Sequence, residues 1–149
     1  MPVPISSTAN LEALSVESLC LPRFTLQPTI PLDKDFLRLI QKIAVEHEEA
    51  LPVWAEHFTS NPSEEAVYFC EKEWRGLSFS PAPHRMDLYT IMRGLSKVFY
   101  PKYDISIAMR QMVLKALFEQ GSKTNVIELH PQAVSRIIQL SLFDQVIWG

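Results

Sequence analysis

The stretch Leu88-Tyr-Thr-Ile-Met-Arg-Gly-Leu-Ser-Lys-Val-Phe-Tyr100 decides the fold class of this chain. Its apolar residues recur every three or four positions, as they do along one face of an α-helix. Pro101 follows directly and cannot continue a helix, so the pattern predicts a helix that ends near Tyr100. Upstream, Ser80-Pro81 is typical of a helix start, with an N-cap serine before a proline. The apolar stripe consists of Leu88, Ile91, Met92, Leu95 and Val98.

Two segments before this stretch also predict helices. From Asp33 to about Leu51-Pro52, apolar residues recur at helical spacing. Asn61-Pro62-Ser63-Glu64 combines an N-cap asparagine, a proline at the first helical position and a glutamate that can bond back to the cap. We therefore expect a second helix over about 62–73.

Two segments after it continue the pattern. An apolar stripe from Ile105 to Ala116 predicts a helix that Gly121 stops, because glycine readily adopts the left-handed conformation of a helix end. Pro131 then opens a last helix that carries Val134, Ile137 and Ile138. The alternation in residues 76–80 predicts at most a short extended segment, and no strong strand pattern accompanies it.

Length and composition fit one domain preceded by an arm. The chain has 149 residues, of which 47% are apolar and 21% charged, which suffices for one core and argues against general disorder. Five of the eleven prolines fall in residues 1–31. We expect residues 1–32 to form an extended N-terminal arm and residues 33–149 a mainly α, single-domain helical bundle of about five helices, with room for a short β-hairpin.

Cysteine usage and hydropathy favour a cytoplasmic protein. Cys20 and Cys70 lie far apart with no Cys-x-x-Cys spacing, so neither a disulfide framework nor a cysteine zinc site is indicated. The chain lacks a run of about 18 apolar residues, which excludes a membrane span. Its first 22 residues contain no lysine or arginine, which argues against a signal peptide.

The charge is distributed unevenly along the chain. Residues 1–74 hold five Lys and Arg against twelve Asp and Glu, and residues 75–149 hold nine against five. Such asymmetry can orient the later half toward an acidic partner, such as a nucleic acid or an acidic protein surface. Equally, it describes an ordinary solvated surface, because charge along a sequence need not separate in space.

Motifs for catalysis, metals and nucleotides are missing. The four histidines lie in separate segments without a His-Glu-x-x-His pattern, and the acidic run around His47 is typical of a solvated helix face. Neither a glycine-rich phosphate loop nor a nucleophile elbow is present. We therefore predict no catalytic residues, no metal site and no cofactor.

Residues 122–139 partly match a helix-turn-helix. Apolar residues stand where the two helices of such a motif pack together: Ile127, Leu129, Val134 and Ile137. The second helix would then expose four polar side chains able to contact bases or phosphates: Gln132, Ser135, Arg136 and Gln139. Thr124 and Glu128 replace the usual small residue and turn glycine, so a plain helical hairpin remains the other interpretation.

Residues 63–143 resemble the DsrC/TusE family of small sulfur-carrier proteins, and the order of segments carries the likeness. Residues 76–81 are similar to the family's glycine-led segment, with His84 near the histidine of its long helix. Ile91-Met92-Arg93 and Phe99-Tyr100 look like the body of that helix. The family's arginine-to-lysine helix is resembled by Ala108-Met109-Arg110 with Lys115-Ala116-Leu117. Its segment before the last helix, and the start of that helix, are resembled by Ile127-Glu128-Leu129-His130-Pro131 followed by Gln132-Ala133.

The end of the chain departs from this family. Its carriers hold persulfide sulfur on a cysteine of a flexible C-terminal arm, because only a thiolate can take and pass that sulfur. Here Gly149 stands near that cysteine's place, and Ile138 near that of a second one. Phe143, Val146, Ile147 and Trp148 should dock on the body or on a partner. The resemblance thus implies a shared fold and partner surface without sulfur transfer.

We therefore predict a non-enzymatic binding or regulatory protein, related to sulfur carriers, that acts through a protein–protein surface. A DNA-binding regulator that uses residues 122–139 is the alternative, and a sulfur relay through Cys70 or Cys20 is a third. Cys70 is expected in the core, where a cysteine behaves as a small apolar residue. The residues predicted to bind a partner or DNA are Arg110, Lys115, Lys123, Gln132, Ser135, Arg136, Gln139 and Trp148.

Overall fold

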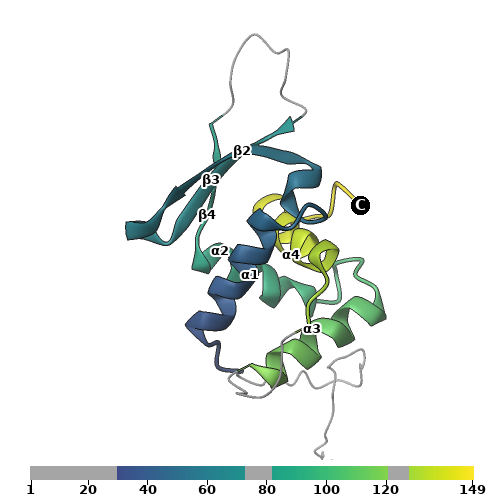
Figure 1. Cartoon of the computed structure of the whole chain (residues 1–149). Helices are drawn as coiled ribbons and strands as arrows, with labels where there is room; N and C mark the ends of the chain where they lie inside the picture. The colour runs from purple at the N-terminus through teal and green to yellow at the C-terminus, as the bar shows by residue number, and fades with distance from the viewer. Residues whose placement is uncertain (1–29, 73–81, 121–127) are drawn as a thin grey trace, which may run out of the picture.

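The computed structural model describes residues 30–72, 82–120 and 128–149 (Figure 1). Four α-helices and one small sheet make up this part of the chain: α1 (Lys34–Glu46), α2 (Leu88–Val98), α3 (Ile107–Glu119), α4 (Pro131–Phe143), and strands β2 (Ala55–Asn61), β3 (Ala66–Glu71) and β4 (His84–Met86). The fold is thus mostly helical, and the sheet makes it an α+β arrangement instead of a pure bundle.

Each helix begins at a side chain that accepts a hydrogen bond from the backbone of its first turn. Asp33 caps α1, Ser106 caps α3, and His130 caps α4 directly before Pro131. Asp87 and Thr90 cap α2 reciprocally, in a capping box. The apolar stripes predicted from sequence therefore belong to helices. Helix α2 starts at Leu88. The helix start predicted at Ser80-Pro81 lies outside the described residues.

The predicted helix over 62–73 is wrong. Pro62–Glu64 form one turn of 3-10 helix, after which Glu65 adopts a left-handed conformation with φ of 51°. The Asn61 side chain makes no capping hydrogen bond, and residues 66–71 are β3. The run Val67-Tyr68-Phe69 combines β-branched and aromatic residues, which fit a half-buried strand better than a helix. Residue 73 lies outside the described part.

The sheet is antiparallel in the order β2-β3-β4 and lies beside the helices (Figure 1). Val67 pairs with Met86, and Phe69 pairs with His84. Between Glu56 and Thr59 the register of β2 shifts, and His57 within this bulge has φ of 63°. Phe69 and Met86 are fully buried, so the sheet contributes one of its faces to the core.

Helix α4 lies at the centre of the core. It buries residues on most of its circumference, and α2 packs closely against it. Gly94 makes this close approach possible, because a Cβ atom there would lie 2.2 Å from the carbonyl oxygen of Ile137. The buried residues of α4 are Ala133, Val134, Ser135, Ile137, Ile138, Gln139 and Leu140.

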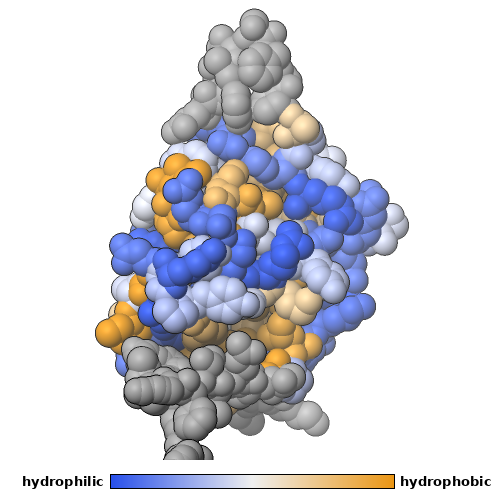
Figure 2. Space-filling view, turned by 180° about the vertical axis from the view of Figure 1, so that it is seen from behind, coloured by the Kyte–Doolittle hydropathy of each residue, from blue (hydrophilic) through white to orange (hydrophobic). Residues whose placement is uncertain are grey.

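The surface seen from behind carries both hydrophilic and hydrophobic residues. Figure 2 shows hydrophilic residues in a broad band across the middle, with hydrophobic residues above this band on one side and again toward the lower end. Among the helices of the described segments, none is long and apolar enough to cross a membrane.

Replacing Gly94 by alanine tests the packing of α2 on α4. The added methyl group would overlap the backbone of Ile137, so we expect Gly94→Ala to lower the free energy of unfolding by about 3 kcal/mol, despite alanine's higher helix propensity. Ser96→Ala, at an exposed position of the same helix, is the control and should change it by less than about 0.5 kcal/mol. Equal changes in the free energy of unfolding for Gly94→Ala and Ser96→Ala, measured by urea unfolding, would contradict this packing.

Candidate binding site

The C-terminal segment after α4 folds back onto that helix. The Gln139 side chain, which is fully buried, holds this segment by its backbone. Its carbonyl oxygen accepts hydrogen bonds from the backbone N–H groups of Ile147 at 2.7 Å and Trp148 at 2.8 Å. Its NH₂ group donates to the carbonyl oxygen of Trp148 at 2.9 Å and to the Ser135 hydroxyl at 3.1 Å. All the hydrogen-bonding positions of this amide are therefore used.

Aromatic packing fixes the same segment. The rings of Trp148 and Trp54 are stacked, with centroids 4.6 Å apart and 1° between their planes. Phe143 meets both rings edge to face. The Trp54 indole N–H donates to the Ser135 hydroxyl at 2.9 Å, so the buried ring also satisfies its polar group. Docking of the C-terminal segment, which the sequence predicted, is confirmed for Phe143, Val146 and Trp148, while Ile147 remains half exposed.

Asp144 anchors the turn between α4 and this segment. It adopts the left-handed conformation of a helix C-cap, and its N–H donates to the Leu140 carbonyl oxygen. Its carboxylate accepts from the Tyr103 hydroxyl and pairs with the Lys97 ammonium at 3.0 Å. These two donors lower the pKa of Asp144. The hydrogen bond with Asp144 in turn raises the pKa of Tyr103. Asp144, the first residue after α4, therefore fixes the direction in which the chain continues.

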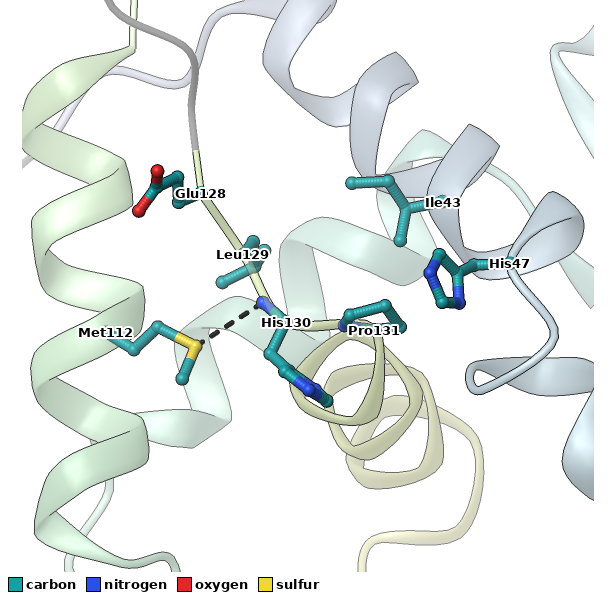
Figure 3. A pocket seen from close by; sticks show the side chains of 7 residues that line it. All are labelled: Ile43, His47, Met112, Glu128, Leu129, His130 and Pro131. Atoms are coloured by element: carbon teal, nitrogen blue, oxygen red, sulfur yellow. Dashed lines mark hydrogen bonds between the residues drawn. The ribbon is translucent and has the colours of Figure 1, made fainter.

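An open groove lies beside the first turn of α4 (Figure 3). Its volume is about 480 Å³. Side chains from three elements border it, and residues 128–131 run along it between α1 and α3. Apolar and polar groups both line it: Ile43, His47, Met112, Glu128, Leu129, His130 and Pro131.

Local hydrogen bonds orient the imidazoles of this groove. Nδ1 of His47 accepts from the N–H of Glu49, and Nδ1 of His130 accepts from the N–H of Gln132. The other ring nitrogen of His130 lies 3.9 Å from the Glu49 carboxylate. The His130 backbone N–H donates to the Met112 sulfur at 3.5 Å, which joins α3 to the start of α4 (Figure 3).

A second, smaller hollow of about 100 Å³ adjoins the docked segment. Gln132, Trp54 and Trp148 are among its lining residues, and Glu49 links it to the groove through His130. The first turn of α4 thus lies between two hollows. The Ser135 hydroxyl, which also lines the smaller hollow, already accepts two hydrogen bonds within the fold.

The structure brings five of the predicted binding residues together on α4 and the segment after it. Gln132 is exposed, Arg136 is half-buried with a guanidinium nitrogen 3.4 Å from the Gly149 oxygen, and Val134 and Ile137 point inward as predicted. The expected exposure of Ser135 and Gln139 is wrong. Both are buried, because Trp54 and the C-terminal segment cover this side of α4.

The predicted residues on α3 lie elsewhere. Arg110 donates to the carbonyl oxygens of Val98 at 2.9 Å and Tyr103 at 2.9 Å, so it ties the end of α2 to the start of α3. Lys115 is exposed. Lys123 lies outside the described residues, as do Gly121 and the rest of residues 122–127 of the helix-turn-helix-like segment.

The structure describes one of the two cysteines. Cys70 is a free cysteine on β3 and is half-buried, so its expected place in the core is wrong: it alternates with Phe69, which faces the core. Cys20 lies outside the described part of the chain. Within the described segments, no three His, Cys, Asp or Glu side chains are grouped so that they could hold a metal ion.

The groove and the partner of Trp148 could not be predicted from the sequence. Ile43, Met112 and Trp54 belong to segments far apart in the chain, and no local pattern joins them. The pair Trp54 and Trp148 was the available signal, since large aromatic residues often pack together.

Comparison with protein families, curated proteins and solved structures gives no match to this chain. The resemblance of residues 63–143 to the DsrC/TusE carriers therefore stays a prediction from the residues.

Replacing Gln139 by leucine tests how the C-terminal segment is held. Leucine fills a similar space but removes the hydrogen bonds that the Gln139 amide makes with the backbone of Ile147 and Trp148, so we expect a loss of about 1–3 kcal/mol in the free energy of unfolding. Stacking of Trp148 on Trp54 should also weaken, which near-ultraviolet circular dichroism detects. Gln132→Leu, at an exposed position of the same helix, is the control. An unchanged spectrum and stability in Gln139→Leu would contradict the described contacts.

Proposed function

We propose that this chain is a non-enzymatic binding protein that acts through a protein–protein surface around the first turn of α4. One observation carries the proposal: the groove formed by α1, α3 and residues 128–131 has an apolar floor and remains open to solvent. Leu129 is buried at its base, while Met112 and Pro131 are only partly covered. These partly covered apolar side chains offer a contact for an apolar side chain of a partner.

The shape of the groove favours a segment of another protein. Its volume of about 480 Å³ is within the usual range for bound groups, but a small molecule is normally enclosed on most of its surface. An open groove instead receives a side chain that a larger partner presents. Met112 suits this role, because the flexible thioether adapts to differently shaped side chains.

The charges beside the groove favour a basic partner segment. Glu128 lines the groove and is exposed, and the Glu49 carboxylate lies beside His130. A lysine or arginine next to an apolar residue would place its charge near these carboxylates while the apolar side chain enters the groove. The same carboxylates oppose a nucleic acid phosphate at this place.

Kinship with the sulfur carriers belongs to the proposal as a hypothesis from the residues. Because the C-terminal segment is docked and contains no cysteine, this hypothesis does not include sulfur transfer. Such a relative would keep a binding surface and lack the carrier chemistry.

Selection from a displayed random-peptide library on the full chain tests this function. We expect enriched peptides to carry an apolar residue beside a lysine or arginine. Glu128→Lys should weaken their binding about fivefold, because the reversal replaces an attraction with a repulsion. Asp104→Lys makes the same change of charge at an exposed site that does not line the groove, and should have little effect.

Two outcomes would overturn the proposal. The first is a set of peptides that bind the wild type and Glu128→Lys equally well. The second is tight binding of a labelled DNA duplex at physiological salt that Arg136→Ala abolishes, which would favour the DNA-binding alternative.

A further inference from the structure

Helix α3 is apolar on two sides. One side packs into the core through Met109, Val113, Ala116 and Leu117. The other side carries Ile107, Leu114 and Phe118, which follow one another at steps of seven and four residues and therefore share a face. We call these three residues the outer face of α3.

This outer face is strongly exposed. Phe118 has 73% of its surface accessible and Ile107 has 69%, the two largest fractions among the large hydrophobic residues of the described segments. Leu114 between them is half-buried. Figure 2 shows hydrophobic residues toward the lower end of the molecule, where Figure 1 places α3. Apolar side chains exposed along one face of a helix form a surface that a partner can cover.

The described chain begins at the C-terminal end of this helix. Gln120 follows α3 directly, and its side chain donates to the Pro31 carbonyl oxygen at 2.9 Å and accepts from the Asp33 N–H at 2.8 Å. Ile30 and Leu32 beside these residues pack against the core. Residues 1–29 therefore join the described chain beside the end of α3 that carries Phe118.

Residues 1–29 are long enough and apolar enough to cover the outer face. The thirteen residues of α3 span roughly 20 Å at 1.5 Å each, a distance that about six extended residues cover. Between positions 11 and 26 the segment is rich in leucine. Its large apolar residues there are Leu11, Leu14, Val16, Leu19, Leu21, Phe24 and Leu26.

We propose that residues 11–26 of this chain dock on the outer face of α3. Attachment beside Gln120 keeps the segment at a high local concentration there, so it outcompetes a second copy of the protein in dilute solution. Lys115, exposed one turn before Phe118, provides a complementary charge for Glu12 or Glu17 of the segment. This docking does not depend on the function proposed for the groove.

Thiol cross-linking in the full chain tests the proposal. Cys70→Ser leaves Cys20, within the segment, as the natural thiol. Gln111→Cys adds a second thiol on α3, one turn after Ile107 and exposed. We expect a short bismaleimide to link these two cysteines within one chain about tenfold faster than in the control, which carries Thr59→Cys at an exposed site on β2.

A charge on the outer face should release the segment. Phe118→Glu should reduce the cross-link several-fold and speed trypsin cleavage after Arg23, whereas Tyr89→Glu, at a similarly exposed aromatic residue of α2, should do neither. Because Phe118 is exposed, Phe118→Glu should remain folded, which circular dichroism checks. Equal cross-linking rates at positions 111 and 59, or links formed only between two chains, would overturn the proposal.

Discussion

The buried amide of Gln139 is the constraint on which the centre of this structure depends. A primary amide without partners would be costly inside a core, and here its oxygen and its NH₂ group each make two hydrogen bonds. These partners are the Ser135 hydroxyl and the backbone of Ile147 and Trp148. The helix and the segment that follows it must therefore form together, since each satisfies polar groups of the other.

The position of α4 explains why Ser135 and Gln139 are buried. Gly94 allows α2 to approach on one side, and Trp54 with the C-terminal segment covers another. Ser135 and Gln139 consequently serve the fold, while Gln132 in the first turn stays accessible. The groove and the smaller hollow lie on either side of this turn, so the packing of α4 leaves this part of its surface open.

The helices could be predicted from sequence because their patterns are local. Apolar spacing marked α1, α2 and α3, and Pro131 marked the start of α4. The sheet could not, because Asn61-Pro62-Ser63-Glu64 has the residues of a helix start, whereas the chain makes one 3-10 turn there and continues as β3. For the site, helical spacing places Ser135 and Gln139 near Gln132 but cannot reveal burial. They are covered by Trp54, which is distant in sequence, and by Trp148, which lies beyond the end of the helix.

Amide hydrogen exchange in the wild-type chain tests most directly whether Gln139 holds the C-terminal segment closed. The described contacts predict that the N–H groups of Ile147 and Trp148 exchange at least about a hundredfold more slowly than in an unstructured peptide, because both are hydrogen-bonded to a buried oxygen. The N–H of Gln145, in an exposed residue before them, serves as an internal reference. Exchange of Ile147 and Trp148 at the rate of a free peptide would contradict the account.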